Sequence, residues 1–274
     1  MQKNKVRVKE DIWQSPEGYQ RTSKRLQKSY LEKLLKRIPI KGRVLDVGCG
    51  TANSLEVLNQ ADVTEYYGVD ISAAMIKYAA DRFPKFRKNF VCGDFLSIDK
   101  EALGEFNNII CAACLHWFHP DQQKVINTIF DMLSVGGVLH LSTALSFDYL
   151  SGEELVQEQV LNEVRIKYKP VRDSDTFSSR RASRECISRF LERFELIAIS
   201  RHEEKLSFGN FEDFRDWHIG SGSVVFKQFP VETQDQATDL YYRLLYGRYE
   251  RGSYQVAYAT ALITARKGSQ SDDL

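Results

Sequence analysis

The stretch from Arg43 to Asn53, which reads RVLDVGCGTAN, decides the fold of this chain. An apolar run containing an acid leads into two glycines one residue apart, Gly48 and Gly50, and then into a helix-like segment. Glycine lets the backbone turn sharply, and it lets a ligand approach main-chain atoms that a Cβ would shield. We therefore predict a strand, a tight turn and a helix, with a ligand at the turn.

A second acid stands at the end of the next apolar run, Tyr67–Ser72, where Asp70 closes the predicted strand. An acid placed about twenty residues after such glycines binds the two hydroxyls of a ribose in α/β nucleotide-binding folds. The alternative is a tight turn that holds no ligand. We favour a nucleoside site because the acid follows the glycines at the required spacing.

The position of the third glycine separates two classes of nucleoside ligand. A dinucleotide fingerprint has a glycine three residues after the second one, beside the pyrophosphate. This chain has Asn53 there, and Asp46 would repel a pyrophosphate. A ligand that carries a sulfonium and an ammonium group is better suited to an acid at the strand end. The pattern favours S-adenosylmethionine over NAD.

A third element, Phe90–Phe95, contains the pair Gly93-Asp94. In this order and spacing the three segments resemble the class I S-adenosylmethionine-dependent methyltransferases. In that family the carboxylate of such an Asp takes the exocyclic amine of adenine, and the next backbone N–H meets the ring. The resemblance assigns the following residues to the cofactor: Tyr19, Asp46, Gly48, Cys49, Gly50, Asn53, Asp70, Ile71, Met75, Gly93, Asp94, Phe95 and Ala112.

Composition limits the classes of partner. The 274 residues suffice for one sizeable core with a smaller cap, and the net charge of +1 offers no basic field for a nucleic acid backbone. No apolar run is long enough to span a bilayer, and the N-terminus lacks the apolar core of a signal peptide. We expect a cytoplasmic protein that acts on a small molecule, with neither nucleic acid nor membrane as partner. The oligomeric state stays open.

The five cysteines do not read as a disulfide framework, because their number is odd and their spacing is scattered. Cys111 and Cys114 match the C-x-x-C pattern of a redox or zinc half-site. The alternative is that both end a buried strand, where cysteine acts as a small apolar residue. We favour the second interpretation, since no second pair accompanies the first, and we expect no metal.

Alternating apolar and helical segments in the first half predict an α/β fold. With the resemblance, this gives a Rossmann-like, seven-stranded, mostly parallel sheet with helices on both faces and a small, mainly helical cap inserted after the fifth strand. The expected organisation is a helical arm at 1–40, the S-adenosylmethionine-binding core at 41–143, a lid with the C-terminal strands of the same sheet at 144–267, and a disordered tail at 268–274.

Individual elements follow from periodicity. Expected strands are Arg43–Val47, Glu65–Asp70, Asn89–Cys92, Asn108–Ala112, Val138–Ser142, Glu195–Ser200 and Tyr254–Lys267. Expected helices are Pro16–Arg37, Ser54–Asn59, Ala73–Arg82, Gln122–Leu133, Ile187–Phe194, Phe211–His218 and Thr233–Arg248. The polar stretch Ala144–Ser183 shows weak periodicity and is expected to be an irregular insertion. Three tyrosines of the last helix, Tyr241, Tyr242 and Tyr246, are expected in the core.

Leu115–Phe118 follows the fourth strand, where the family's loop faces the transferable methyl group. The resemblance gives His116 a contact with the acceptor and makes Trp117 a wall of its pocket, so these two are the catalytic candidates. The alternative is that Trp117 belongs to the core and that His116 caps the next helix. We favour the functional interpretation, since the preceding motifs fix the position of this loop.

Over nearly the whole chain the pattern is similar to the group that contains the trans-aconitate and malonyl carrier protein methyltransferases, although it is loose after residue 143. This likeness implies a carboxylate acceptor. Its positive partners would be Arg180 and Arg181, since arginine grips carboxylates through paired N–H bonds, and Trp217 would also contact the substrate. The alternative for the arginines is a solvated basic turn beside Asp173 and Asp175.

The chemistry leaves three possibilities open. A carboxylate is ionised at neutral pH and needs no general base, whereas a hydroxyl or amine would need one, and His116 is the candidate. A NAD-dependent oxidoreductase is disfavoured by Asn53 and by Gly93-Asp94. A non-catalytic protein that binds S-adenosylmethionine is the third possibility.

Overall fold

The computed structural model describes residues 16, 20, 24–146, 152–171, 175–249 and 254–268. The chain divides into two compact units. The sheet unit comprises Lys24–Leu145, Ala182–His202 and Ala259–Leu274. The helical unit comprises Met1–Ser23, Ser146–Arg181 and Glu203–Tyr258. Strands β6 and β7 contribute residues to both.

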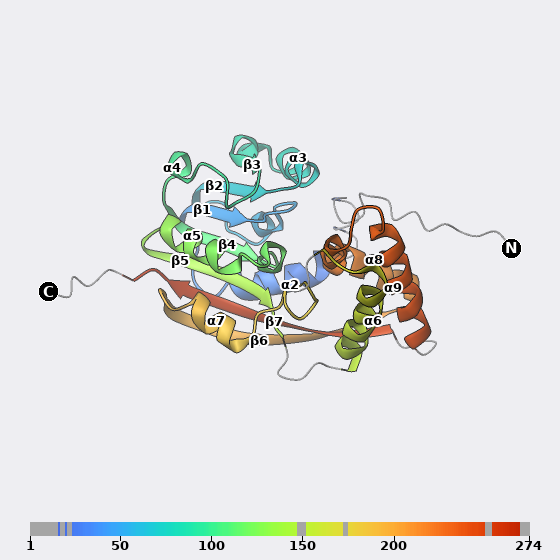
Figure 1. Cartoon of the computed structure of the whole chain (residues 1–274). Helices are drawn as coiled ribbons and strands as arrows, with labels where there is room; N and C mark the ends of the chain where they lie inside the picture. Colours follow the sequence, from blue (N-terminus) through green and yellow to red (C-terminus); the bar gives the residue numbers. More distant parts are fainter. Residues whose placement is uncertain are drawn as a thin grey trace. The chain divides into compact units, whose positions relative to one another are not determined.

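Among the described residues seven strands form one sheet, in the order β3-β2-β1-β4-β5-β7-β6 (Figure 1). Their bounds are Gly42–Val47 (β1), Val63–Asp70 (β2), Phe90–Cys92 (β3), Phe106–Ala112 (β4), Leu133–Ala144 (β5), Glu195–Phe208 (β6) and Tyr254–Arg266 (β7). β1 pairs in parallel with both β2 and β4, β2 with β3, and β4 with β5, whereas β7 runs antiparallel to β5. The predicted fold class, a Rossmann-like, mostly parallel sheet of seven strands, is confirmed.

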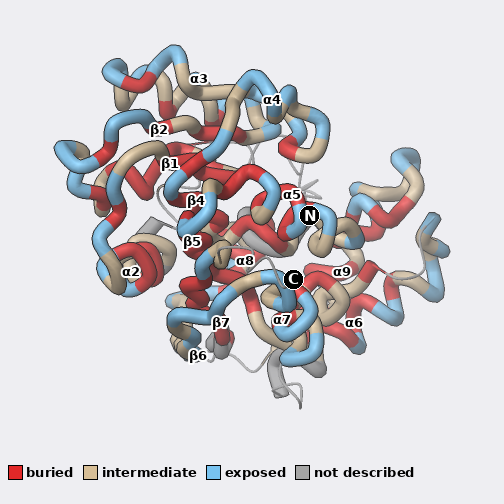
Figure 2. Tube along the Cα trace, turned by 90° about the vertical axis from the view of Figure 1, so that its left-hand side faces the viewer, coloured by how far each residue is buried: buried red, intermediate tan, exposed pale blue. Residues whose placement is uncertain are grey.

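Helices lie on both faces of this sheet. The helices of the sheet unit are α2 (Lys24–Leu35), α3 (Ala73–Arg82), α4 (Lys100–Leu103), α5 (Gln122–Met132) and α7 (Arg184–Phe190), with 3-10 turns η1 (Asn53–Glu56), η2 (Pro84–Asn89) and η3 (Leu115–Phe118). α5 and α7 share one apolar cluster with the strands, and α2 lies on the opposite face (Figures 1 and 2). The strands at the centre are buried (Figure 2) because both faces are covered.

The helix after β2 was predicted with its observed bounds, because its start carries a clear cap. The Ser72 side chain accepts a hydrogen bond from the Met75 backbone N–H, and the helix then runs over Ala73–Arg82. Of the predicted arm helix Pro16–Arg37, the structure shows α2 at Lys24–Leu35, and most of the preceding residues lie outside the described part of the chain.

The predicted helix Ser54–Asn59 is wrong. The structure has only the 3-10 turn η1 at Asn53–Glu56. The chain enters it through Ala52 in a left-handed conformation, with φ of 57°, and the Leu55 N–H bonds to the Ala52 carbonyl three residues back. Such i to i+3 bonds seldom extend beyond one turn.

The helical unit is built from α6 (Gly152–Tyr168), α8 (Phe211–Gly222), η4 (Ser223–Gln228) and α9 (Gln234–Arg248). Its apolar cluster is rich in rings, among them Phe214, Trp217, Phe226 and Tyr241. Aromatic side chains bury large areas, so a few suffice for a small core. Among the described residues no helix has the length and apolar character needed to cross a membrane.

The expectation that Ala144–Ser183 is irregular is wrong, since α6 occupies much of it. Gln157 and Glu158 are buried beside the apolar residues of this helix, which include Val160, Leu161 and Val164. Glu158 Oε1 accepts hydrogen bonds from the backbone N and the Oγ of Ser178, at 2.6 and 2.7 Å. Polar residues on the inward face dilute the periodic signal that identifies a helix.

Strand β6 is also longer than predicted, because it continues past Ser200 to Phe208. From Ala198 onward its residues alternate between exposed and half-buried. Arg201, Glu203 and Lys205 therefore project into solvent from alternate positions, which a strand allows. The charged residues that follow Ser200 thus form the exposed face of the same strand.

Candidate functional site

The loop after β1 turns through three residues with positive φ: Gly48 at 67°, Gly50 at 52° and Ala52 at 57°. The backbone N–H groups of Gly48 and Cys49 both donate to the Val69 carbonyl oxygen, at 2.8 and 3.0 Å. These bonds tie the loop to the end of β2. Since β1 is also paired with β4, the loop lies where the strand order reverses, which is the usual ligand position in open α/β sheets.

Asp70, the last residue of β2, is held in one orientation by the surrounding backbone. Its Oδ2 accepts from the Gly50 N–H at 2.9 Å, and its Oδ1 accepts from the Ser72 N–H at 2.8 Å. Burial raises the pKa of this carboxyl, and the two N–H bonds oppose that effect. A carboxylate oxygen has more than one acceptor site, so both oxygens can also accept from ligand hydroxyls.

Asp46, the second acid of the site, lies near the end of β1 and is only 4% exposed. Its Oδ2 accepts from the Ser54 hydroxyl at 2.5 Å and from the Tyr66 hydroxyl at 2.7 Å. Burial raises the pKa of Asp46 to about 6; the two hydroxyl bonds lower it, and the nearby charge of Asp70 adds to the rise. The Asp46 carboxyl is therefore mainly ionised at neutral pH, and its negative charge favours a cationic ligand group nearby.

The two glycines of the loop have different surroundings. A Cβ on Gly48 would lie 1.9 Å from Cys114 Sγ, whereas a Cβ on Gly50 would have no atom within 4 Å. Gly48 is thus a packing requirement, and Gly50 faces open space beside the Asp70 carboxylate. The open side of the loop therefore offers main-chain atoms and a fixed carboxylate together.

Asn53 has a structural role that the sequence did not indicate. It is buried, and its Oδ1 accepts from Arg82 Nη1 at 3.1 Å. Arg82 also forms an ion pair with Glu56. The amide at the position of the absent third glycine thus helps to hold η1 against the end of α3. The sequence feature that could have shown this contact is Arg82, the basic residue at the end of the predicted helix Ala73–Arg82.

Gly93–Phe95 begins beside Asp70, because the Gly93 N–H donates to the Asp70 carbonyl at 2.9 Å. Asp94 is exposed and its Oδ1 accepts from the Leu96 N–H at 3.0 Å, while Phe95 is buried. Cys49 and Met75 are buried, and Ile71 is 73% exposed. The structure therefore brings the residues after β1, β2 and β3 to one edge of the sheet unit. Tyr19 lies outside the described residues.

His116 and Trp117 lie in η3, which starts three residues after Ala112, the last residue of β4. Both are half-buried, and their ring centroids are 5.2 Å apart. Ala113, with φ of 51°, turns the chain, and its N–H donates to Ser142 Oγ at 2.9 Å. Parallel neighbours β1 and β4 end at the same edge, so η3 follows that edge as the glycine loop does.

The three residues expected to bind substrate belong to the helical unit. Arg180 forms a two-pronged ion pair with Asp175, with Nε–Oδ1 and Nη2–Oδ2 both at 2.6 Å, and both side chains are buried. The Arg181 N–H donates to the Ser178 carbonyl at 3.1 Å. Trp217 is 7% exposed and packs among Phe208 and Phe214. Asp173, the other acid of this turn, lies outside the described residues.

No group of three or more His, Cys, Asp and Glu side chains in the described part of the chain is arranged to hold a metal ion. Cys111 and Cys114 are both buried, and a hydrogen bond with the Cys111 thiol, together with burial, raises the pKa of Cys114 well above its usual value. A protonated, buried thiol is a poor metal ligand or nucleophile, so this pair acts here as packing.

Residues 44–137 match the model of a methyltransferase domain. Trans-aconitate 2-methyltransferase of Variovorax paradoxus is 35% identical over 39% of this chain and 41% of its own length. Malonyl-[acyl-carrier protein] O-methyltransferase of Acetivibrio thermocellus is 29% identical over 51% of this chain and 47% of its own. Carboxy-S-adenosyl-L-methionine synthase of Campylobacter curvus is 31% identical over 43% of this chain and 50% of its own length. The chain thus spans half or less of the length of these curated relatives. The resemblance to the class I methyltransferases is confirmed.

Solved structures support the fold over a larger share of the chain. A protein of Bacillus halodurans C-125 aligns with a TM-score of 0.59 and 21% identity over 88% of this chain and 100% of its own. The cyclase SpnF aligns with a TM-score of 0.52 and 18% identity over 88% and 80%. These identities are low, so the alignments speak for the fold alone.

Replacing Gly48 by Ala should destabilise the protein by about 2–4 kcal/mol, because the new Cβ meets Cys114 Sγ and the backbone has positive φ. Gly136→Ala is the matched control, since Gly136 also has positive φ, 78°, but open space at its Cβ. It should lose only about 1–2 kcal/mol. Urea unfolding of both variants measures the difference, and equal losses would contradict the packing role of Gly48.

The raised pKa of Asp46 should make the stability of the protein depend on pH. Its folded-state pKa of about 6 lies above the value of 3.8 for an unperturbed carboxyl, so the folded state binds the proton more tightly than the unfolded state. Its contribution is complete below pH 3.8 and disappears as the pH rises through about 6. The loss amounts to about 3 kcal/mol at neutral pH. In urea unfolding between pH 4.5 and 7.5, a range of about three pH units, the free energy of unfolding should fall for the wild type and not for Asp46→Asn. Parallel plots of this free energy against pH for the two proteins would refute the assignment.

Proposed function

We propose that this protein is an S-adenosylmethionine-dependent methyltransferase that methylates a small molecule at a carboxylate oxygen. The observation that carries the proposal is the Asp70 carboxylate, fixed by the N–H groups of Gly50 and Ser72 beside an open glycine loop. The match of residues 44–137 to the methyltransferase domain supports it.

The residues present fit this cofactor. Asp70 can accept from two ribose hydroxyls, Asp94 is exposed for the adenine amine, and Asp46 supplies negative charge for a cationic group. The open space at Gly50 allows a ligand to reach the main chain. When bound, the cofactor supplies a methyl group already activated on a positively charged sulfur.

The acceptor oxygen needs no proton removed if it belongs to a carboxylate, because that group is ionised at neutral pH. The new O–CH₃ bond forms as the S–CH₃ bond breaks. The electron pair of the S–CH₃ bond stays on sulfur, so the products are an ester and S-adenosylhomocysteine. The protein's task is then to align the two reactants and to exclude water. The relatives named for trans-aconitate and malonyl carrier protein support an acceptor of this class.

A hydroxyl or amine acceptor is the second candidate, favoured by the position of His116. This residue is half-buried in η3, directly after β4, and its ring lies beside that of Trp117. A neutral imidazole there can take the proton that such an acceptor must lose. In this case Trp117 forms a wall against which the acceptor packs.

Asp70→Asn tests the cofactor part of the proposal. The variant should bind S-adenosylhomocysteine about 10- to 100-fold more weakly than the wild type, because it loses charge-assisted hydrogen bonds to the ribose. Asp62→Asn is the control, since Asp62 is an exposed acid of the same unit that bonds to Asn59. Isothermal titration calorimetry gives both affinities. Tighter binding of NAD than of S-adenosylhomocysteine would reject the methyltransferase in favour of an oxidoreductase.

His116→Ala separates the two acceptor classes. With a carboxylate acceptor the variant should keep most of its kcat, whereas with a hydroxyl or amine it should lose about a hundredfold or more. Trans-aconitate is the first acceptor to assay, in comparison with a phenol and a primary amine, with detection of S-adenosylhomocysteine. A hundredfold loss on a proven carboxylate substrate contradicts the base-free mechanism. Tight cofactor binding without turnover of any acceptor points to a non-catalytic binding protein.

A further inference from the structure

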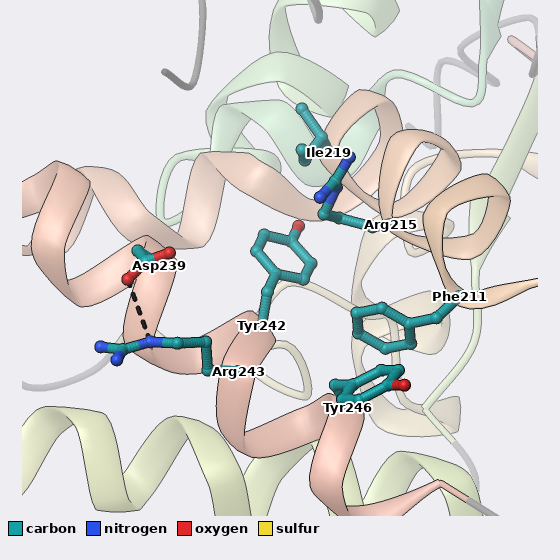
Figure 3. A pocket seen from close by; sticks show the side chains of 7 residues that line it. All are labelled: Phe211, Arg215, Ile219, Asp239, Tyr242, Arg243 and Tyr246. Atoms are coloured by element: carbon teal, nitrogen blue, oxygen red, sulfur yellow. Dashed lines mark ion pairs between the residues drawn. The ribbon is translucent and has the colours of Figure 1, made fainter. Parts of the chain in front are cut away.

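The helical unit contains a pocket of its own, with a volume of about 200 Å³, between α8 and α9 (Figure 3). Its lining consists of Phe211, Arg215, Ile219, Asp239, Tyr242, Arg243 and Tyr246. The α8 residues are spaced by four, and the α9 residues by three, one and three, so each set forms one stripe of its helix. None of them is among the residues assigned above to the cofactor or the acceptor.

The walls of the pocket are aromatic and aliphatic. Phe211, Ile219 and Tyr242 are buried, whereas Tyr246 is 54% exposed. Tyr246, which was expected in the core, is therefore a wall residue; its ring stands edge-on to Phe211 with centroids 5.1 Å apart (Figure 3). Its helical neighbours Tyr241 and Tyr242 are buried as expected. An exposed aromatic ring at the mouth of an apolar pocket is suited to cover a flat ligand.

The polar groups of the pocket are unevenly satisfied. Arg243 pairs with Asp239, with Nε–Oδ2 at 3.0 Å, as the dashed line in Figure 3 marks. Arg215 approaches only its sequence neighbour Asp216 among the ion pairs of the described residues, at 3.5 Å, and its Nε is buried without a hydrogen-bond acceptor. A buried N–H of a charged group without an acceptor is costly, so Arg215 is less well satisfied by the protein than Arg243 is.

The hydroxyl of Tyr242 is already engaged on its inner side. It lies 2.9 Å from His218 Nδ1, and burial lowers the pKa of His218 to about 3, so this imidazole is neutral. A neutral ring whose Nδ1 accepts would fix the Tyr242 hydroxyl as the donor. Among the lining residues Asp239 offsets Arg243, whereas Asp216, the partner of Arg215, does not line the pocket, so the positive charge of the lining comes from Arg215.

We propose that this pocket binds a small monoanion with a flat apolar body, such as an aryl carboxylate, whose carboxylate accepts from Arg215 and whose ring packs against Phe211 and Tyr246. Arginine pairs with planar carboxylates through parallel N–H bonds, and Arg215 is the lining arginine whose ion-pair partner, Asp216, is not among the lining residues. The volume is smaller than that of a drug-sized site, which limits the ligand to on the order of ten non-hydrogen atoms.

The test is a titration of the full chain with phenylacetate, followed by calorimetry or by saturation-transfer NMR. Phenylacetate should bind saturably, and phenylacetamide, its neutral counterpart, should bind about tenfold more weakly. Arg215→Gln should weaken phenylacetate binding by about tenfold or more, and Tyr246→Ala by several-fold. Arg248→Gln is the matched control, because Arg248 is an arginine of α9 that pairs with Glu163 and does not line the pocket.

Three results would overturn the proposal: no saturable binding of phenylacetate, equal affinity for acid and amide, or an equal effect of Arg215→Gln and Arg248→Gln. Arg215→Lys, which keeps the charge but loses the Nε–H, covers the case in which the glutamine variant fails to fold, and it should also weaken binding. The readout is direct binding, so it does not depend on whether the chain proves to be a methyltransferase.

Discussion

The candidate site depends on how the end of β2 holds the loop that follows β1. Two loop N–H groups, of Gly48 and Cys49, share the Val69 carbonyl, and a third, of Gly50, donates to the Asp70 carboxylate. These bonds are possible because the loop takes positive φ at alternate residues, which aims successive N–H groups at the same strand end. The position of the ligand-facing carboxylate is therefore fixed by backbone geometry before any ligand arrives.

The parts of the fold that the sequence could predict are those in which local signals and burial agree. The central strands are buried on both faces and read as continuous apolar runs, and the helix after Ser72 begins at a capping side chain. The carboxyl ends of such strands bring Asp46, Asp70 and Asp94 to one edge, so spacing alone could group them. The exposure of Asp94 and the hydroxyl partners of Asp46 needed the structure.

The failures share a physical cause, which is that tertiary contacts change what a local pattern means. Helix α6 turns Gln157 and Glu158 inward and supplies Glu158 with partners from Ser178, so its inner face does not look apolar. The segment after the glycine loop has helix-forming residues, yet the left-handed Ala52 starts it as a single 3-10 turn. Asn53, read as a missing glycine, serves as an acceptor for Arg82. A single sequence carries no record of these partners.

This fold does not determine the reaction, since one solved structure with the same fold is named as a cyclase. Reaction type must therefore follow from side chains rather than from the sheet. The close approach of Gly48 and Cys114 also links the substitutions that these two positions accept. The two positions lie far apart in the chain but share a single volume, so a methyl group gained at one must be matched by atoms lost at the other. Whether a larger side chain fits at one of these positions therefore depends on the residue at the other.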